Sequence, residues 1–174
     1  LKAHCLAMVF QKGGGGDGLK AALDRIFSEA EQAIASGATV LVLDDGAVDA
    51  GHVPIPPLLA AAGLHHHLIR RGLRTLAGIV VDSCEVREVM HFAMLIGYGV
   101  NAICPRLAFS TVRNLAENDM LDQSLTTERA TDNYIAAVKK GLLKTFSRMG
   151  ISTIRSFRGA QIFEAIKKKK KLVD

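Results

Sequence analysis

The sequence predicts an α/β fold, with a mostly parallel sheet and flanking helices. Short apolar runs alternate along the chain with stretches whose apolar residues recur at helical spacing. Residues 84–97 separate two of these runs, and consecutive parallel strands need a connection of about that length, roughly a dozen residues or more. Such alternation predicts helices packed against a parallel sheet, as a partial (β/α) barrel or as an open sheet.

The individual elements follow from the same patterns. Ser36 and Gly37 end the first helical stretch, and Pro57 stands where a helix can begin. The segment 46–57 contains three prolines and predicts a loop. Strands are expected at 2–10, 39–43, 75–81, 102–104 and 152–154, and helices at 19–34, 58–72, 84–97, 109–121, 128–149 and 159–168.

Composition and charge favour one domain in a reducing compartment. A chain of 174 residues with 49% hydrophobic content can bury a sizeable core, and no apolar run approaches the ~20 residues that span a bilayer. The net charge is +5, and Lys167–Lys171 supply all five of these charges. We therefore expect a solvated basic end, with no nucleic-acid or membrane partner. Three cysteines without a CxxC pair indicate a reducing, cytoplasmic setting.

The glycine run at 13–18 is one candidate site. Gly13, Gly15 and Gly18 match GxGxxG after an expected strand and before an expected helix, where glycine backbone can approach a phosphate. The match is weak because five of the six positions are glycine, and Asp17 would repel a phosphate. A solvent-facing loop is the favoured interpretation, and a phosphate site is the alternative.

Polar residues follow three of the expected strands. They are Asp44, Asp45, Asp82, Ser83 and Arg106. Ligands of parallel α/β sheets bind at the carboxyl ends of strands, so Asp44 and Asp82 are the other candidates for a cofactor or ligand. Asp and Ser at strand ends also cap the following helix, and capping is the favoured interpretation.

Histidines and cysteines do not predict a metal or a catalytic centre. His65, His66 and His67 are adjacent and would point ~100° apart on a helix, so packing or hydrogen bonding is favoured over metal binding. Glu88 and His91 have a metal-motif spacing without a second motif, which favours a polar network. Cys84 at a helix start would have a lowered thiol pKa, but a catalytic thiol is not the favoured interpretation. We predict no catalytic and no metal-binding residues.

Several segments together resemble one protein family. These are HHHLIRRGLR, VVDSCEVREV, HFAMLIGYG and KGLLKTFSRMGISTIRSFRGAQIFEAI. They are similar, in this order, to the end of the central domain of the large (ferredoxin-dependent or NAD(P)H-dependent alpha) chain of glutamate synthase and to the segment leading into its FMN-binding domain. The family usually has two histidines where this chain has Met90 and His91. After Ile166 the lysine run replaces the expected glycine-leucine continuation.

The resemblance implies a part of a larger enzyme. Such enzymes form glutamate from glutamine and 2-oxoglutarate, with an amidotransferase domain, an ammonia tunnel, FMN and a three-iron, four-sulfur cluster. It implies no cofactor in this segment, and neighbouring amidotransferase and FMN domains as partners. A plant or algal source would place the protein in the plastid stroma.

The expected domain organisation is an α/β part at 1–122 and a helical connector at 123–174 that leads towards the FMN domain. The favoured function is a structural linker without catalysis of its own. One alternative is a free-standing α/β domain that binds a phosphate-bearing ligand at 13–18, and another is an interaction module with a basic tail. Surfaces left uncovered by an absent remainder would favour self-association.

Overall fold

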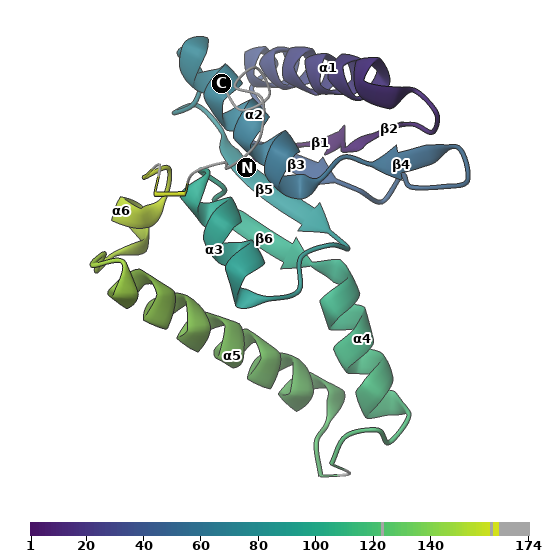
Figure 1. Cartoon of the computed structure of the whole chain (residues 1–174), viewed down its shortest axis with the longest axis vertical. Helices are drawn as coiled ribbons and strands as arrows, with labels where there is room; N and C mark the ends of the chain where they lie inside the picture. Colours follow the sequence, from purple (N-terminus) through teal and green to yellow (C-terminus); the bar gives the residue numbers. More distant parts are fainter. Residues whose placement is uncertain (123, 161, 164–174) are drawn as a thin grey trace.

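A four-stranded parallel sheet is the centre of the computed structural model, which describes residues 1–122, 124–160 and 162–163 (Figure 1). The strand order is β1-β3-β5-β6. This confirms the predicted fold class. The strands are β1 (Ala3–Ala7), β2 (Val9–Gln11), β3 (Val40–Asp44), β4 (His52–Pro54), β5 (Gly78–Ser83) and β6 (Ala102–Pro105), and the helices are α1 (Gly15–Ala35), α2 (Pro57–Arg70), α3 (Val89–Gly97), α4 (Arg106–Glu117), α5 (Thr127–Arg148) and α6 (Ile154–Phe157).

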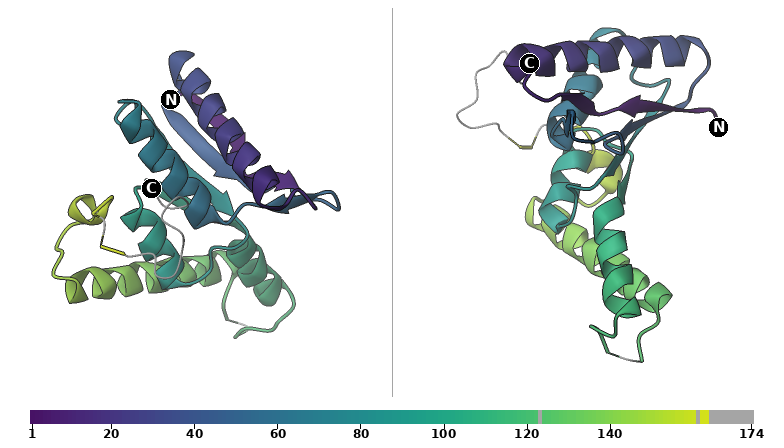
Figure 2. Two further views of the ribbon diagram at one scale, coloured as in Figure 1. Left: turned by 45° about the horizontal axis from the view of Figure 1, so that its top comes forward. Right: turned by 90° about the vertical axis from the view of Figure 1, so that its right-hand side faces the viewer.

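One face of the sheet carries the core. Parallel strands that follow one another in chain order, joined by right-handed crossovers, place all connecting helices on the same face. The strand residues that point to this face are accordingly buried together with residues of α1, α2 and α3. The three helices lie along one side of the sheet (Figures 1 and 2). These buried strand residues are Leu6, Leu41, Leu43, Ile79 and Val81, each 0% exposed.

On the other face of the sheet, the described part of the chain places no helix of this kind. Its residues lie in rows across the strands, and one row joins Cys5, Val42, Val80 and Ala102 by register. Each of these four is half-buried or exposed, and none belongs to the core clusters of the described residues. Parallel sheets are ordinarily covered on both faces, so this arrangement is that of an incomplete barrel whose inner face is open.

A second, antiparallel sheet was not predicted. β2 pairs with β4, with Phe10 opposite Val53, although the prolines of 46–57 predicted only a loop. Pro54 stands at the end of the short strand, where a missing N–H is tolerated. The chain therefore leaves the parallel sheet after β1 and returns to it through α1.

The helices differ from the expected ones mainly at their starts. α2 begins at Pro57 as predicted. α3 begins at Val89 rather than Cys84, and α4 begins at Arg106, directly after Pro105, rather than at Phe109. α5 packs against α3 and α4, with Phe146 buried beside Phe157 of α6 at a ring-centroid distance of 4.1 Å.

Two predictions near the end of the chain are wrong where the structure describes them. Ser152–Ile154 is not a strand, because the Thr153 hydroxyl accepts a hydrogen bond from the Ser156 amide and thereby caps α6. The described residues of the expected helix 159–168 are not helical, and its other residues lie outside the described part of the chain. The lysine run also lies outside the described part of the chain. Among the described residues, no helix is long and apolar enough to cross a membrane.

Candidate functional site at the carboxyl edge of the sheet

Arg106 brings together the carboxylates at the carboxyl ends of β3 and β5. Its Nη2 donates to Oδ1 of Asp44 at 2.5 Å and to Oδ1 of Asp45 at 2.9 Å, and its Nε donates to Oδ1 of Asp82 at 3.1 Å. Asp44, Asp82 and Cys104 share one row of the inner face, and Arg106 follows two residues after Cys104. Arg106 is the first residue of α4, directly after β6, so it lies at the carboxyl edge, where its guanidinium reaches Asp44 and Asp82. We call Arg106, Asp44, Asp45 and Asp82 the Arg106 cluster.

Asp45 is the buried member of the Arg106 cluster, at 4% exposure. Its Oδ2 accepts from the Ser83 hydroxyl at 2.7 Å and from the Cys84 amide at 2.8 Å, while its Oδ1 faces Arg106. Ser83 is fully buried, and its hydroxyl also accepts from the Glu85 amide at 3.1 Å. Both oxygens of a buried carboxylate are therefore satisfied, as burial of a charge requires.

The electrostatics of the cluster favour cations over anions. Three carboxylates face one guanidinium, so the cluster is negative overall. Burial alone would lower the pKa of Arg106, but Asp82, Asp44 and Asp45 raise it above its ordinary value. The residues present thus do not fit the phosphate of FMN, because the carboxylates would repel its negative charge. No group of three or more His, Cys, Asp or Glu among the described residues is arranged to hold a metal ion.

The cysteines beside the cluster are not activated thiols. Burial, followed by the charge of Asp45, raises the pKa of Cys84, and burial followed by Asp82 raises that of Cys104. The expected helix dipole does not act on Cys84, because α3 starts only at Val89. Cys5 and Cys104 lie on the two outer strands, about 14 Å apart by strand spacing. They are therefore too far apart for ligands of one iron–sulfur cluster.

The glycine candidates lie at the first turn of α1. Gly13 and Gly15 have φ values of +84° and +58°, and α1 begins at Gly15, so most of the expected loop is helical. Gly18 lies inside the helix and donates its N–H to the Gly14 carbonyl at 2.8 Å. Asp17 adds a carboxylate to this first turn. The structure does not bring these glycines into the Arg106 cluster, whose Asp44 and Asp82 lie at the ends of β3 and β5.

The three adjacent histidines have different surroundings. His67 bonds to Oε1 of Glu31 at 2.7 Å and stacks on Phe27, so it joins α2 to α1. His65 accepts a hydrogen bond from Arg74 at 2.9 Å, and His66 contacts the ring of His65 edge-on. These contacts are packing and hydrogen bonding, as the favoured interpretation expected.

Glu88 and His91 form the start of α3. Glu88 is its N-cap residue, and Nδ1 of His91 accepts from the Arg87 and Glu88 amides at 3.1 and 3.3 Å. A side chain that accepts from the amides before a helix satisfies donors that the helix itself leaves free. The i, i+3 spacing therefore reflects helix capping.

The fold places this chain in the class of (β/α) barrel proteins, as an incomplete barrel. The polar side chains at the carboxyl edge of its sheet form hydrogen bonds and ion pairs with one another. Solved structures agree with this fold. An L230A mutant flavocytochrome b2 with benzoylformate superposes with a TM-score of 0.64 at 12% identity, over 82% of this chain and 36% of that one. At this identity the likeness concerns the fold alone.

Sequence comparisons identify the family. The model of the glutamate synthase central domain matches residues 1–167. Relatives include the NADPH glutamate synthase large chain of Bacillus subtilis (46% identical over 90% of this chain), the ferredoxin-dependent glutamate synthase of Pyropia yezoensis (42% over 95%) and the NADH glutamate synthase of Saccharomyces cerevisiae (35% over 96%). The chain belongs to the glutamate synthase central domain family. It spans 10%, 12% and 8% of the lengths of these relatives.

Proposed function

We propose that this chain is the structural part of a glutamate synthase that holds the amidotransferase and FMN domains relative to each other, without chemistry of its own. The enzyme as a whole would form glutamate from glutamine and 2-oxoglutarate. In plants the relatives include chloroplastic enzymes, and an enzyme of this kind would act in the cytoplasm or in the plastid stroma.

The observation that carries the proposal is the Arg106 cluster. The carboxyl edge is where (β/α) folds bind ligands. Here the side chains at that edge form hydrogen bonds and ion pairs with one another. The Arg106 cluster is also negative, which disfavours the binding of anionic substrates and of FMN. Capping and charge pairing account for the hydrogen bonds that the Asp45 side chain makes in the described chain.

The open inner face supports a role in contacts between domains. Val42 and Val80 lie half-exposed in an apolar row, and β1 and β6 have no further strand beside them in the described chain. Such a face is ordinarily covered by other parts of a protein. We propose that the remainder of the enzyme covers it, that residues 123–174 connect towards the FMN domain, and that the isolated chain self-associates through this face.

A chimera of a relative tests the proposal. The matching segment of the Bacillus subtilis large chain is replaced by this chain, and glutamine hydrolysis and glutamate formation are measured separately. We expect both activities in the chimera. Val80→Lys in the inner face should reduce glutamate formation at least ~10-fold while the amidotransferase domain still hydrolyses glutamine, because a buried unpaired lysine disrupts an apolar contact.

The matched control is Arg113→Gln on the exposed side of α4. It should leave both activities as in the unsubstituted chimera. Equal glutamate formation by the Val80→Lys chimera would contradict the proposed contact. Binding of FMN or a nucleotide by the chain alone would favour the alternative of a free-standing ligand-binding domain.

A further inference from the structure

The solvent-facing side of α5 carries a regular row of residues. Glu128, Asp132, Ala136, Lys140 and Lys144 follow one another at intervals of four, and each is exposed. Residues at this spacing form one ridge along a helix surface, so the five side chains lie in line. This side of α5 faces away from α3 and α4 (Figures 1 and 2). We call these five residues the α5 ridge. It begins with two carboxylates and ends with two ammonium groups.

The charges of the α5 ridge have no partners within the described chain. None of its four charged residues takes part in an ion pair between described residues. Charged neighbours along the ridge have the same sign, which destabilises a helix slightly. The nearest opposite charges, Asp132 and Lys140, lie about 12 Å apart along the axis, beyond the ~8 Å over which salt screens exposed charges. The ridge is therefore electrostatically unsatisfied in a single copy.

The helix dipole does not explain the whole α5 ridge. Negative charges are favourable in the first turn of a helix and positive charges in the last turn. Glu128 lies in the first turn of α5, whereas the basic residue of the last turn is Arg148. The other three charges of the ridge thus lie outside the turns where the dipole acts.

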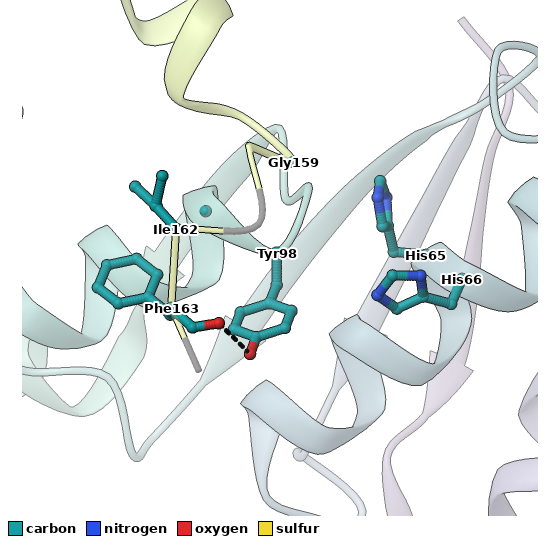
Figure 3. A pocket seen from close by; sticks show the side chains of 7 residues that line it. His65, His66, Tyr98, Gly159, Ile162 and Phe163 are labelled. Carbon is teal, nitrogen blue, oxygen red and sulfur yellow. Dashed lines mark hydrogen bonds between the residues drawn. The ribbon is translucent and has the colours of Figure 1, made fainter. Parts of the chain in front are cut away.

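The opposite side of α5 is fixed to the rest of the fold near both ends. Near its start, the Tyr134 hydroxyl donates to a backbone carbonyl just before α3 at 2.9 Å. Near its end, Phe146 packs against Phe157 of α6. The chain after α6 is in turn held by α3, because the hydroxyl of Tyr98 donates to the carbonyl of Phe163 at 3.3 Å (Figure 3). The α5 ridge is thus positioned in advance, which lowers the entropic cost of docking.

We propose that the α5 ridge binds the same ridge of a second copy of this chain, in antiparallel orientation about Ala136. Reversed about this residue, the ridge is complementary to itself. Asp132 of one copy lies opposite Lys140 of the other, and Glu128 lies opposite Lys144. Two-fold symmetry repeats each contact, so four ion pairs form between the copies.

The shape of the α5 ridge fits this pairing. Helices that pack their i±4 ridges together cross at about −50°, the commonest class of helix packing, and the small Ala136 at the crossing allows a close approach. Leu143 is 67% exposed on the same side. It would lie opposite Arg129 of the second copy, whose methylene groups can cover it. The carboxylates disfavour a nucleic acid or an anionic membrane as the partner. Because one helix per copy makes a small contact, the dimer is weak and reversible.

Sedimentation velocity of the whole chain, from about 10 µM to about 1 mM, tests for such a weak dimer. The native chain and Val80→Lys are both measured, because Val80→Lys removes association through the inner face of the sheet. We expect a dimer of Val80→Lys that forms with increasing concentration and weakens at high salt. The result is independent of the proposed structural role, which concerns the inner face.

Charge reversal distinguishes this pairing from other association. Lys140→Glu with Lys144→Glu makes the ridge wholly acidic, and Glu128→Lys with Asp132→Lys makes it wholly basic. Each double variant alone should associate at least ~10-fold more weakly than the unreversed chain, because every facing pair then repels. An equimolar mixture of the two should associate again, since all facing pairs become attractive.

The matched control is Lys12→Glu with Arg113→Glu, two exposed residues outside α5. It makes the same change in net charge as the acidic ridge and should dimerise like the unreversed chain. If a charge-reversed variant does not fold, Ala136→Arg decides, because two arginines would meet at the symmetry axis and should abolish the dimer. A monomer throughout the concentration range, equal association after charge reversal, or a mixture that does not associate would overturn the proposal and leave the ridge to another part of the enzyme.

Discussion

The two edges of the sheet are polar in opposite ways. At the carboxyl edge three carboxylates surround Arg106, and the buried Asp45 has both oxygens bonded. At the amino edge Arg74 and Arg158 have no carboxylate among the described residues, and one guanidinium nitrogen has no partner. In (β/α) barrels the carboxyl edge normally supplies chemistry and the amino edge stability. In this chain the carboxyl edge pairs its charges internally, whereas the amino edge leaves one buried guanidinium nitrogen, Nε of Arg158, without a partner among the described residues.

Of the substitutions predicted to disturb the two edges, removal of Arg106 should lower the free energy of unfolding most. Arg106→Met leaves three carboxylates facing one another, with Asp45 buried at 4% exposure. Because the arginine side chain is itself 36% exposed, we expect a loss of about 2–3 kcal/mol in the free energy of unfolding, less than for a fully buried pair. Urea denaturation measures it. Arg113→Gln on the same helix should change it by less than ~0.5 kcal/mol, and equal losses in both variants would contradict the importance of the cluster.

Acid should weaken the amino edge through His65. The unfolded chain takes up a proton near pH 6.5, whereas burial holds the pKa of the folded His65 at about 4. The stability is therefore full above pH 6.5 and falls as the pH decreases towards 4. Since solvent reaches part of the ring, we expect a loss of about 2 kcal/mol.

Urea midpoints at pH 7 and pH 4.5 measure this loss. His65→Gln keeps an acceptor for Arg74 and should remove the part of the pH dependence that the imidazole causes. His4→Gln, at an exposed histidine, is the control and should retain it. If the stability of His65→Gln depended on pH as that of the native chain does, His65 would not be the cause of the acid sensitivity.

A carboxylate added to the amino edge should stabilise it slightly. Asn101→Asp keeps an acceptor for the Ile79 amide, at 2.9 Å in the native chain, and places a negative charge beside Arg74. Because Asn101 is exposed, we expect a gain of only ~0.5 kcal/mol at pH 7.

The gain should disappear as acid protonates the new carboxylate, below pH ~4. Asn114→Asp on α4 is the matched control, and denaturation at pH 7 and pH 3 compares the two variants. A loss of stability in Asn101→Asp at pH 7 would show that the amino edge does not lack negative charge.

The sequence predicted the features that depend on repeated patterns. Four apolar runs became the four parallel strands, and the polar residues after them, Asp44, Asp45, Asp82 and Arg106, came together because parallel strands end at one edge. The choice between a partial barrel and an open sheet needed the strand order. Since that order is sequential, it favours the barrel.

Features without a recognisable side-chain pattern in the sequence were not predicted. Arg74 bonds to the carbonyls of Ala77 and Gly99, and such acceptors have no side-chain signature in a sequence. The antiparallel pair β2–β4 has only three residues in each strand, too few for a periodicity. Ser152–Ile154 resembled a strand by residue type, but the Thr153 side chain caps a helix that begins at Ile154.

The most direct test of the structural role is a survey of the purified chain by absorbance and thermal shift with FMN, NADPH, ATP, 2-oxoglutarate and glutamine. Because the carboxyl edge is negative and its side chains bind one another, we expect a colourless protein whose unfolding midpoint is unchanged by each compound. A yellow protein, or a saturable shift with any of the five, would contradict this account and make the carboxyl edge or the glycine run at 13–18 a ligand site.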